Sequence, residues 1–432
     1  MRAYVLERAW VDGAVRDDVL VEIEGGRFTR VEPGAAHAEK IPGLTIPGFA
    51  NTHSHAFHRA LRGRTQRGRG TFWTWREQMY AVAARLDPDS YFELALATYR
   101  EMAGTGITCV GEFHYLHHQP DGTPYADPNA MGNALIAAAE QAGIRITLLD
   151  TLYLSSGFGA PVQGVQVRYD DGSAAQWLDR IAEFAPTAGA RIGVAAHSVR
   201  AVPPDALAVL GGHTAESGVP VHVHLSEQIK ENADCLAEHG RTPTQVLADT
   251  GILGPMTSVV HATHLTDDDL ALLGAARAYA SFCPTTERDL GDGIGPSRRL
   301  HDAGVRLTLG SDSHAVIDHF EEMRALEMNE RLATRTRGNW SAAELLTAAT
   351  RHDSLGWPDA GEIAVGRRAD LVTLDVETPR TAGTGADEHT AVFAATAADV
   401  TTTIVDGQVV YRAEDRADIG RALTAAVERV QP

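Results

Sequence analysis

Lysine is almost absent from this 432-residue chain, which contains only Lys40 and Lys230. The scarcity excludes a GK[ST] phosphate-binding loop. It also leaves few candidates for a Schiff-base or metal-bridging lysine. Cysteine is scarce as well: Cys109, Cys235 and Cys283 are widely spaced and odd in number. This argues against a disulfide framework or a CxxC metal site, so we expect each cysteine to be a small core residue.

The sequence also has few basic residues and no long apolar run. With 38 basic and 57 acidic residues the formal net charge is −19, which argues against a nucleic acid or an anionic membrane as partner. An anionic small substrate stays possible, because screening lets local arginines decide what a cleft attracts. No apolar run reaches the length of a membrane span, and the opening residues lack the features of a signal peptide. We therefore expect a cytoplasmic protein.

Short apolar, β-branched runs recur along the chain, and most are separated by segments rich in Ala, Leu, Glu and Arg such as 90–106 and 133–143. Buried strands that alternate with helices indicate an α/β protein with a parallel sheet. The sequence therefore predicts a (β/α)8 TIM-type barrel over residues 48–362. A doubly wound open sheet is the alternative, although eight strands are not expected of it. The eight predicted strands are 44–51, 106–114, 145–154, 191–199, 219–227, 257–264, 278–286 and 305–313.

The flanks have a different pattern. Residues 19–33 read as strand, Gly-Gly turn and strand, and residues 401–412 as strand, Asp-Gly turn and strand. The segment 366–376 supplies a further strand beside the second hairpin. Because an isolated hairpin is not stable, we expect residues 1–47 and 363–432 to form one small β-sandwich domain built from both ends of the chain.

Ionisable side chains gather where the predicted strands end. In a barrel the chemistry takes place at the carboxyl ends of the strands, and six of the eight predicted strands finish on such residues. They are His53 and His55, His114 and Tyr115, His197 with Arg200, His224 with Glu227, His261 and His264, and Asp312 and His314.

The first of these pairs suggests a metal site. His53 and His55 are two residues apart on a strand, so both side chains project to the same face. With His224 and Asp312 they provide three nitrogens and one carboxylate, which suits a catalytic Zn²⁺ and is also compatible with Fe²⁺ or Mn²⁺. We expect His117 and His118 to lie in a polar loop without a specific role.

Four motifs stand at the ends of predicted strands: HxH at the first, HxxE at the fifth, His at the sixth and SD at the eighth. This set resembles the amidohydrolase superfamily, and the resemblance covers nearly the whole chain. Some members bind a second metal through a carboxylated lysine on the fourth strand, where this chain has RIGVAAHSV. The resemblance therefore implies a mononuclear site. Within the superfamily, the chain resembles the formimidoylglutamate deiminase family. The similar segments, in order, are NTHSHAFHRAL, FWTWREQMY, EFHYLHH, HSVRAV, HVHLSEQ, VHATH, LGDG and GSDSH.

This resemblance implies hydrolysis of N-formimino-L-glutamate to N-formyl-L-glutamate and ammonia, in histidine degradation, by a homodimer. It implies metal ligation by His53, His55, His224 and Asp312, and catalysis by Glu227, His261 and Asp312. The implied substrate contacts are Tyr115, His197, Arg200, Arg76 and His58, where the family often has glutamine in place of His58. Arg200 also offers a planar fork that matches one of the two carboxylates of this substrate.

Two other functions stay open at this point. One is an aminohydrolase that acts on a purine, a pterin or another heterocycle through the same mononuclear site. The other is a metal-binding barrel without catalysis, although Glu227, His261 and Asp312 are all present. Single residues also have structural interpretations: Arg76 could pair with Glu77 or Glu101, Arg200 could belong to an ion pair at the barrel rim, and Asp312 could cap a helix.

Overall fold

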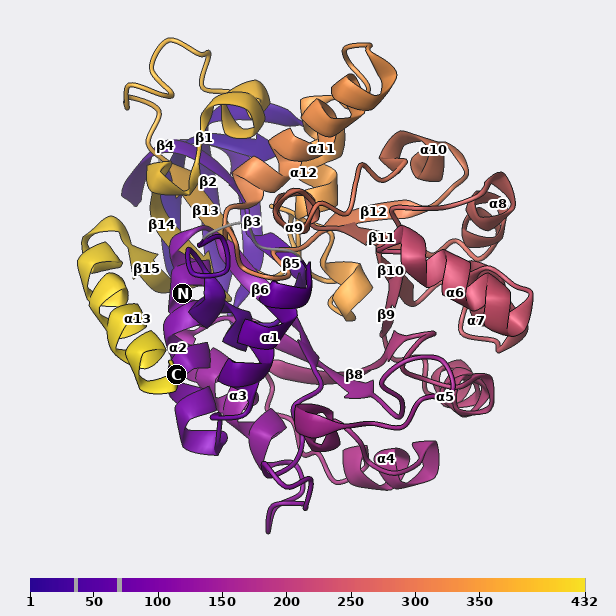
Figure 1. Ribbon diagram of the computed structural model, residues 1–432. Helices are drawn as coiled ribbons and strands as arrows, with labels where there is room; N and C mark the ends of the chain where they lie inside the picture. Colours follow the sequence, from indigo (N-terminus) through magenta and orange to yellow (C-terminus); the bar gives the residue numbers. More distant parts are fainter. Residues whose placement is uncertain (35–37, 68–71, 432) are drawn as a thin grey trace.

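The computed structural model describes residues 1–34, 38–67 and 72–431. Its centre is a sheet of eight parallel strands in which each strand pairs with the next one along the chain (Figure 1). A parallel bridge between Ser54 and Asp312 brings the last strand back beside the first, so the barrel is nearly closed. The predicted barrel is confirmed. Its strands are β5 (Phe49–Ser54), β6 (Ile107–His114), β7 (Arg145–Leu152), β8 (Ala190–Ser198), β9 (Val221–Leu225), β10 (Thr257–His261), β11 (Tyr279–Phe282) and β12 (Arg306–Leu309).

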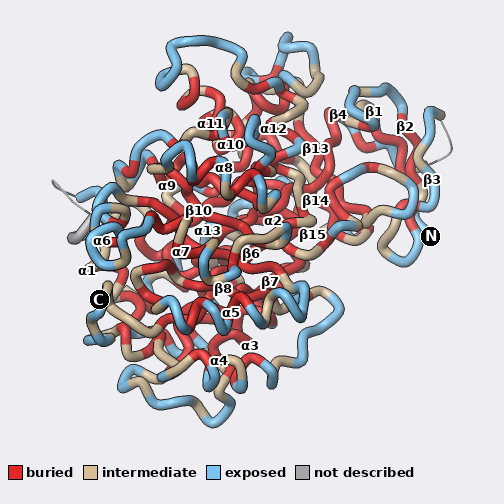
Figure 2. Tube along the Cα trace, turned by 90° about the vertical axis from the view of Figure 1, so that its right-hand side faces the viewer, coloured by how far each residue is buried: buried red, intermediate tan, exposed pale blue. Residues whose placement is uncertain are grey.

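Helices cover the outside of the barrel (Figure 1), and the tube in Figure 2 is buried along most of the strands and exposed at the outer turns. Local signals fix the ends of the two predicted helices. Asp87 caps α2 by accepting from Ser90 N at 2.8 Å, and Gly143, with a φ of 81°, ends α3. The helices are α1 (Phe72–Ala83), α2 (Pro88–Gly104), α3 (Ala130–Ala142), α4 (Ala174–Ile181), α5 (Pro204–Ser217), α6 (Ile229–His239), α7 (Pro243–Asp249), α8 (Asp267–Ala275), α9 (Pro284–Leu290), α10 (Ser297–Asp302), α11 (His319–Thr334) and α12 (Ala342–Ala349).

Both ends of the chain meet in a separate seven-stranded mixed sheet, as predicted, with the strand order β15-β14-β13-β4-β1-β2-β3. Buried side chains of β1 to β4 share one core with Leu371 and Ile404 of the other half. The Gly-Gly and Asp-Gly turns have positive φ at both central residues, as tight hairpins require. The strands are β1 (Arg2–Val11), β2 (Ala14–Glu24), β3 (Arg27–Pro33), β4 (Glu39–Pro47), β13 (Leu371–Leu374), β14 (Val400–Val405) and β15 (Gln408–Arg412).

One predicted strand is wrong in its limits. The segment 44–51 does not form a single barrel strand, because β4 ends at Pro47 in the small sheet and β5 begins at Phe49 in the barrel. Gly48 makes the change of direction, and a Cβ on it would lie 2.3 Å from the Thr108 Cγ2 atom. The domain limits 1–47, 48–362 and 363–432 stay a proposal.

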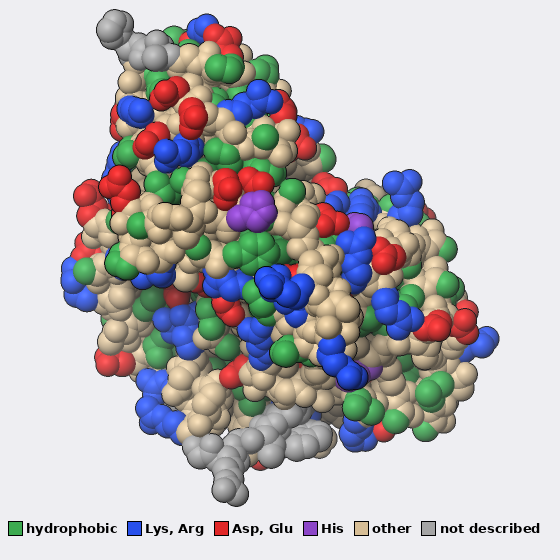
Figure 3. All heavy atoms as spheres, turned by 90° about the horizontal axis from the view of Figure 1, so that it is seen from above, with side chains coloured by type: hydrophobic (Ala, Val, Ile, Leu, Met, Phe, Trp, Pro, Cys, Tyr) green, Lys and Arg blue, Asp and Glu red, His purple; other side chains and the backbone are tan. Residues whose placement is uncertain are grey.

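A further helix, α13 (Arg416–Val430), packs against α2 and was not predicted. Within the described ranges, none of the helices combines the length and apolar character needed to cross a membrane. On the face shown in Figure 3, acidic and basic side chains are interspersed.

Candidate active site

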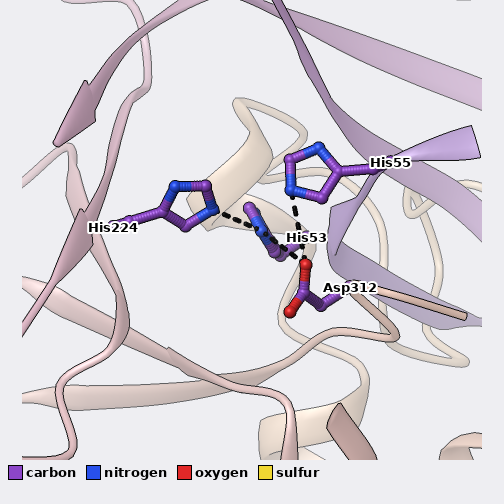
Figure 4. Close-up of side chains that lie close together, drawn as sticks. All are labelled: His53, His55, His224 and Asp312. Carbon is purple, nitrogen blue, oxygen red and sulfur yellow. Dashed lines mark hydrogen bonds and ion pairs between the residues drawn. The ribbon is translucent and has the colours of Figure 1, made fainter. Parts of the chain in front are cut away.

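Four side chains from three parts of the barrel converge at the carboxyl end of the sheet (Figure 4). His53 belongs to β5, His55 follows it, His224 lies on β9 and Asp312 follows β12. One Asp312 oxygen, Oδ1, lies 3.3 Å from the Nε2 atoms of both His53 and His55. The His224 and His53 Nε2 atoms are 3.0 Å apart. The structure therefore brings the predicted metal ligands together, with one ligand atom of each within 4.8 Å of the others.

The chemistry of these donors fits a cation. The Nδ1 atoms of His55 and His224 lie 2.9 Å and 3.0 Å from the carbonyl oxygens of Phe113 and His197. A carbonyl only accepts, so Nδ1 carries the hydrogen and the Nε2 lone pair faces the centre. Burial lowers the pKa of His55 to about 3 and that of His224 well below its usual value, which keeps both rings neutral. Neutral imidazoles and a carboxylate are the donors of a catalytic metal site with open positions.

The backbone around the site is unusual. Asp312, His261 and Ser226 have φ values of 40°, 69° and 50°, in the left-handed region that residues other than glycine rarely occupy. The Asp312 N–H donates to the His53 carbonyl at 3.0 Å, which ties the turn after β12 to β5. Such strained positions persist only where the surrounding structure determines them, and they gather at functional sites.

His261 lies among carboxylates. Its Nε2 atom is 3.9 Å from Glu227 Oε1 and 3.7 Å from Asp312 Oδ2, and its Nδ1 atom is 3.5 Å from Glu287 Oε1. Burial by itself would lower the pKa of His261, but the carboxylates outweigh it and raise the pKa to about 10. Glu287 was not predicted, although it lies on α9, directly after the seventh barrel strand β11.

The predicted substrate residues line the same cavity as three of the predicted metal ligands, His55, His224 and Asp312. Tyr115, His197, Arg200, Arg76 and His58 all border it. The His58 Nε2 atom lies 3.1 Å from the Tyr115 hydroxyl, and the rings of Tyr115 and His197 are 5.5 Å apart.

The neighbours of Arg200 and Arg76 bear on whether these arginines belong to structural ion pairs. Arg200 Nε is 3.9 Å from a buried Glu231 oxygen, a neighbour the sequence did not indicate. Arg76 stands over the Tyr80 ring at 5.5 Å. Glu101, one of the suggested partners of Arg76, pairs with Arg59 and Arg62.

Several cavity residues were not predicted, among them Tyr80, Tyr153 and Tyr169. Tyr80 lies on α1, Tyr153 directly after β7 and Tyr169 in the loop before α4. A tyrosine near the end of the third predicted strand was a usable signal for Tyr153. The positions of Tyr80 and Tyr169 depend on long loops and had no local signal.

His117 and His118 lie in the loop after β6, as expected, but not in polar, exposed surroundings. Both are buried, and they lie 3.9 Å from Asp150 and 3.1 Å from Asp171. His114, His117 and Asp150 form a second His/Asp group outside the barrel pocket. Both Asp150 oxygens accept hydrogen bonds from Arg180, at 2.9 and 2.7 Å. The guanidinium supplies the positive charge there, so this group does not fit a metal ion.

Comparison with known proteins agrees with the geometry. Residues 44–410 match the amidohydrolase family. The formimidoylglutamate deiminase of Pseudomonas aeruginosa is 39% identical over 90% of this chain and 89% of that protein. A 5-methylthioadenosine/S-adenosylhomocysteine deaminase of Natronomonas pharaonis is 28% identical over 92% of this chain and 89% of that protein. The crystal structure of an amidohydrolase from Brucella melitensis has a TM-score of 0.88 and 33% sequence identity, and the match covers 100% of both chains. The chain therefore belongs to the amidohydrolase family, in which it is a homologue of formimidoylglutamate deiminase.

Proposed function

We propose that the protein is a metal-dependent deiminase that hydrolyses N-formimino-L-glutamate to N-formyl-L-glutamate and ammonia, a step of histidine degradation. One observation carries the proposal: Arg200, His197 and Tyr115 border the same cavity as Glu227 and three of the proposed metal ligands, His55, His224 and Asp312. A cavity with both a hydrolytic centre and carboxylate-binding donors suits an acyclic substrate that carries carboxylates. The 39% sequence identity between this chain and the Pseudomonas aeruginosa formimidoylglutamate deiminase supports the same substrate.

The proposed metal is one Zn²⁺ per chain, held by His53, His55, His224 and Asp312, and the same donors would hold Fe²⁺ or Mn²⁺. Such an ion supplies Lewis acidity, which permits hydrolysis at neutral pH. The second-metal lysine of some relatives has no counterpart on β8, whose sequence is ARIGVAAHS, so we propose a mononuclear site.

Three side chains would handle the protons. Asp312 is ionised and so has a free oxygen to accept a proton from the attacking water: burial would raise the pKa of its carboxyl, but the hydrogen bond to His53 outweighs burial and holds that pKa well below the usual range. His261 orients that water through its Nε2 atom, which faces both Asp312 and Glu227. Glu227, three residues after His224, carries a proton to the departing nitrogen, as a general acid within reach of the reacting group.

The substrate contacts in this proposal are Arg200 for one carboxylate, His197 and Tyr115 beside it, and His58 and Arg76 at the neighbouring wall. His58 takes the place of a glutamine, and its ring already meets the Tyr115 hydroxyl at 3.1 Å. An imidazole N–H can donate to a substrate as an amide does.

A heterocyclic substrate is the second candidate. Trp75, Tyr115 and Tyr153 give the cavity aromatic walls, and the Natronomonas pharaonis relative is named as a deaminase of adenosine compounds. A purine, however, offers no carboxylate for Arg200. A metal-binding barrel without catalysis is a third, weaker candidate, since every proposed catalytic side chain is present in the site.

The test is release of ammonia by purified, zinc-loaded protein from N-formimino-L-glutamate, with N-formimino-L-aspartate and a panel of purines and pterins alongside. We expect fast release from the glutamate compound. Activity confined to a purine or pterin would keep the metal site and refute the substrate. No activity on any compound, with full metal content, would favour the barrel without catalysis.

We also propose a cytoplasmic homodimer that binds neither nucleic acid nor membrane. Light scattering on the eluting peak of a sizing column measures the mass, and a mass near 46.3 kDa, that of one chain, would contradict the dimer.

A further inference from the structure

We propose that the hydroxyls of Tyr80 and Tyr153 form a second carboxylate-binding element of the cavity, aligned from behind by Gln166. This inference rests on the proposed function and extends it: the substrate's two carboxylates would bind to two different sets of donors. One set is the arginine side around Arg200, and the other is this tyrosine pair.

The orientation of Gln166 follows from its neighbours. Gln166 is buried in a short turn of helix, Gly164–Arg168. Its Oε1 atom lies 3.2 Å from the backbone N–H of Gln163. That N–H can only donate, so the oxygen must face it and the amide nitrogen must face the other way. The Nε2 atom lies there 2.9 Å from the Tyr153 hydroxyl and 3.1 Å from the Tyr80 hydroxyl.

The amide nitrogen has two hydrogens, one for each phenol oxygen. Each phenol oxygen therefore accepts from Gln166 and keeps its own hydrogen to donate elsewhere. Both tyrosines border the cavity, whereas Gln166 stands behind them. A group bound in the cavity thus meets two O–H donors, and an anionic oxygen is the acceptor that profits most from them.

The surroundings favour an anion at this point. The guanidinium of Arg76 stands over the Tyr80 ring, and both Arg76 and Arg200 act electrostatically on Tyr153. Burial nevertheless raises the pKa of Tyr153, so its hydroxyl keeps its proton at neutral pH. Beside the pair, the buried Tyr169 borders the same cavity, and its hydroxyl has no hydrogen-bond partner among the described residues.

The geometry has a consequence for specificity. A purine or pterin would face these O–H donors without a carboxylate to satisfy them, and unsatisfied buried polar groups cost affinity. The tyrosine pair therefore selects for a dicarboxylic substrate over a heterocycle of similar size.

The first experiment uses the zinc-loaded double variant Tyr80→Phe/Tyr153→Phe and three substrates. These are N-formimino-L-glutamate, N-formimino-4-aminobutyrate, which lacks the α-carboxylate, and N-formimino-L-norvaline, which lacks the side-chain carboxylate. We expect KM for the glutamate compound to rise about tenfold or more, since hydrogen bonds to a charged group are lost, while kcat stays within about threefold. KM should rise equally for the analogue that keeps the tyrosine-bound carboxylate and stay unchanged for the other analogue.

The second variant is Gln166→Glu. A carboxylate keeps the contact with the Gln163 N–H but accepts from the tyrosines, which turns both hydroxyls away from the cavity. It should reproduce the pattern of the double variant although both tyrosines remain. Tyr125→Phe is the matched control, because the Tyr125 hydroxyl lies outside the cavity lining and accepts from Arg168 at 3.4 Å, and we expect it to behave like wild type.

KM values within twofold of wild type in both variants, or equal increases for the two analogues, would overturn the inference. Thermal unfolding and metal content identify a variant that fails to fold, in which case Gln166→Glu decides. Wild-type protein that releases ammonia from no formimino compound would refute the proposed function instead, so the two failures are distinguishable.

Discussion

At the scale of single residues, Glu227 has the position of a proton carrier. Its Oε1 atom faces His261 at 3.9 Å, and its backbone N–H donates to Glu231 Oε2 at 3.3 Å, which fixes the start of the turn after β9. Glu227 is not among the four converging metal donors. Glu227→Gln should therefore keep the full metal content and lower kcat by about 100-fold or more. Steady-state kinetics together with metal analysis measures both quantities, and unchanged turnover would remove Glu227 from the mechanism.

Arg200 allows a separate test of substrate binding. Arg200→Met keeps the length of the side chain and removes the fork, so KM for N-formimino-L-glutamate should rise about tenfold or more. Arg299→Met is a suitable control, because this exposed arginine pairs with Asp267 on the surface and does not line the cavity. A KM within twofold of wild type in Arg200→Met would place Arg200 in a purely structural ion pair with Glu231.

At the scale of secondary structure elements, the contact between β12 and β5 positions the proposed metal ligands His53 and Asp312. Gly310 follows β12, and a Cβ on it would lie 2.8 Å from His53 Cβ and 2.9 Å from the His53 carbonyl oxygen. Gly310→Ala should push the two strands apart, reduce bound zinc and destabilise the protein by about 1–3 kcal/mol.

The measurement for Gly310→Ala is the zinc-to-protein ratio with unfolding followed with and without zinc, since a ligand of the native state stabilises it. Gly212→Ala provides the control, because Gly212 is exposed on α5 with no heavy atom near the added Cβ. The free energy of unfolding of this variant should rise by about 0.5–1 kcal/mol. Full zinc binding by Gly310→Ala would show that the strand contact tolerates the extra methyl group.

The predictions from sequence succeeded where the signal is local. Apolar runs with an ionisable residue at the end identify the strands, and they place His53, His55 and His224 at the same end of the barrel, because direction along a barrel strand decides which end carries chemistry. The division at Pro47 was missed because β4 pairs with β13, more than 300 residues away in the chain. The burial of His118 depends on Asp171 in a distant loop, and the contact of Gln166 with Tyr80 joins the helical turn Gly164–Arg168 to α1, about 80 residues earlier in the chain.

At the scale of the whole molecule, a buried ion pair joins the barrel to the small sheet. Arg145 begins β7 and meets Asp370, the residue before β13, and both are 1% exposed. The Arg145 guanidinium lies 5.4 Å from the Trp357 ring. Arg145→Met would leave the Asp370 carboxylate buried without its partner, which costs about 3–5 kcal/mol. Because the pair is far in the fold from the carboxyl ends of the strands, kcat at moderate temperature should stay near that of wild type; a large loss of kcat would contradict this separation.

The same pair predicts how stability depends on pH. Burial alone would raise the pKa of Asp370, but Arg145 outweighs it and holds the pKa below its usual value. The folded pKa is therefore lower than the unfolded one of about 3.9, so the contribution is complete above about pH 5 and is lost as the pH falls. Urea unfolding measures the free energy of unfolding of wild type and of Asp370→Asn. The difference between the two values should be constant between pH 7 and 5 and should shrink by roughly 1 kcal/mol at pH 3.5. A difference that stays constant to pH 3.5 would show that Asp370 titrates alike in the folded and unfolded chains, and that Arg145 stabilises the junction by packing on Trp357 and not by its charge.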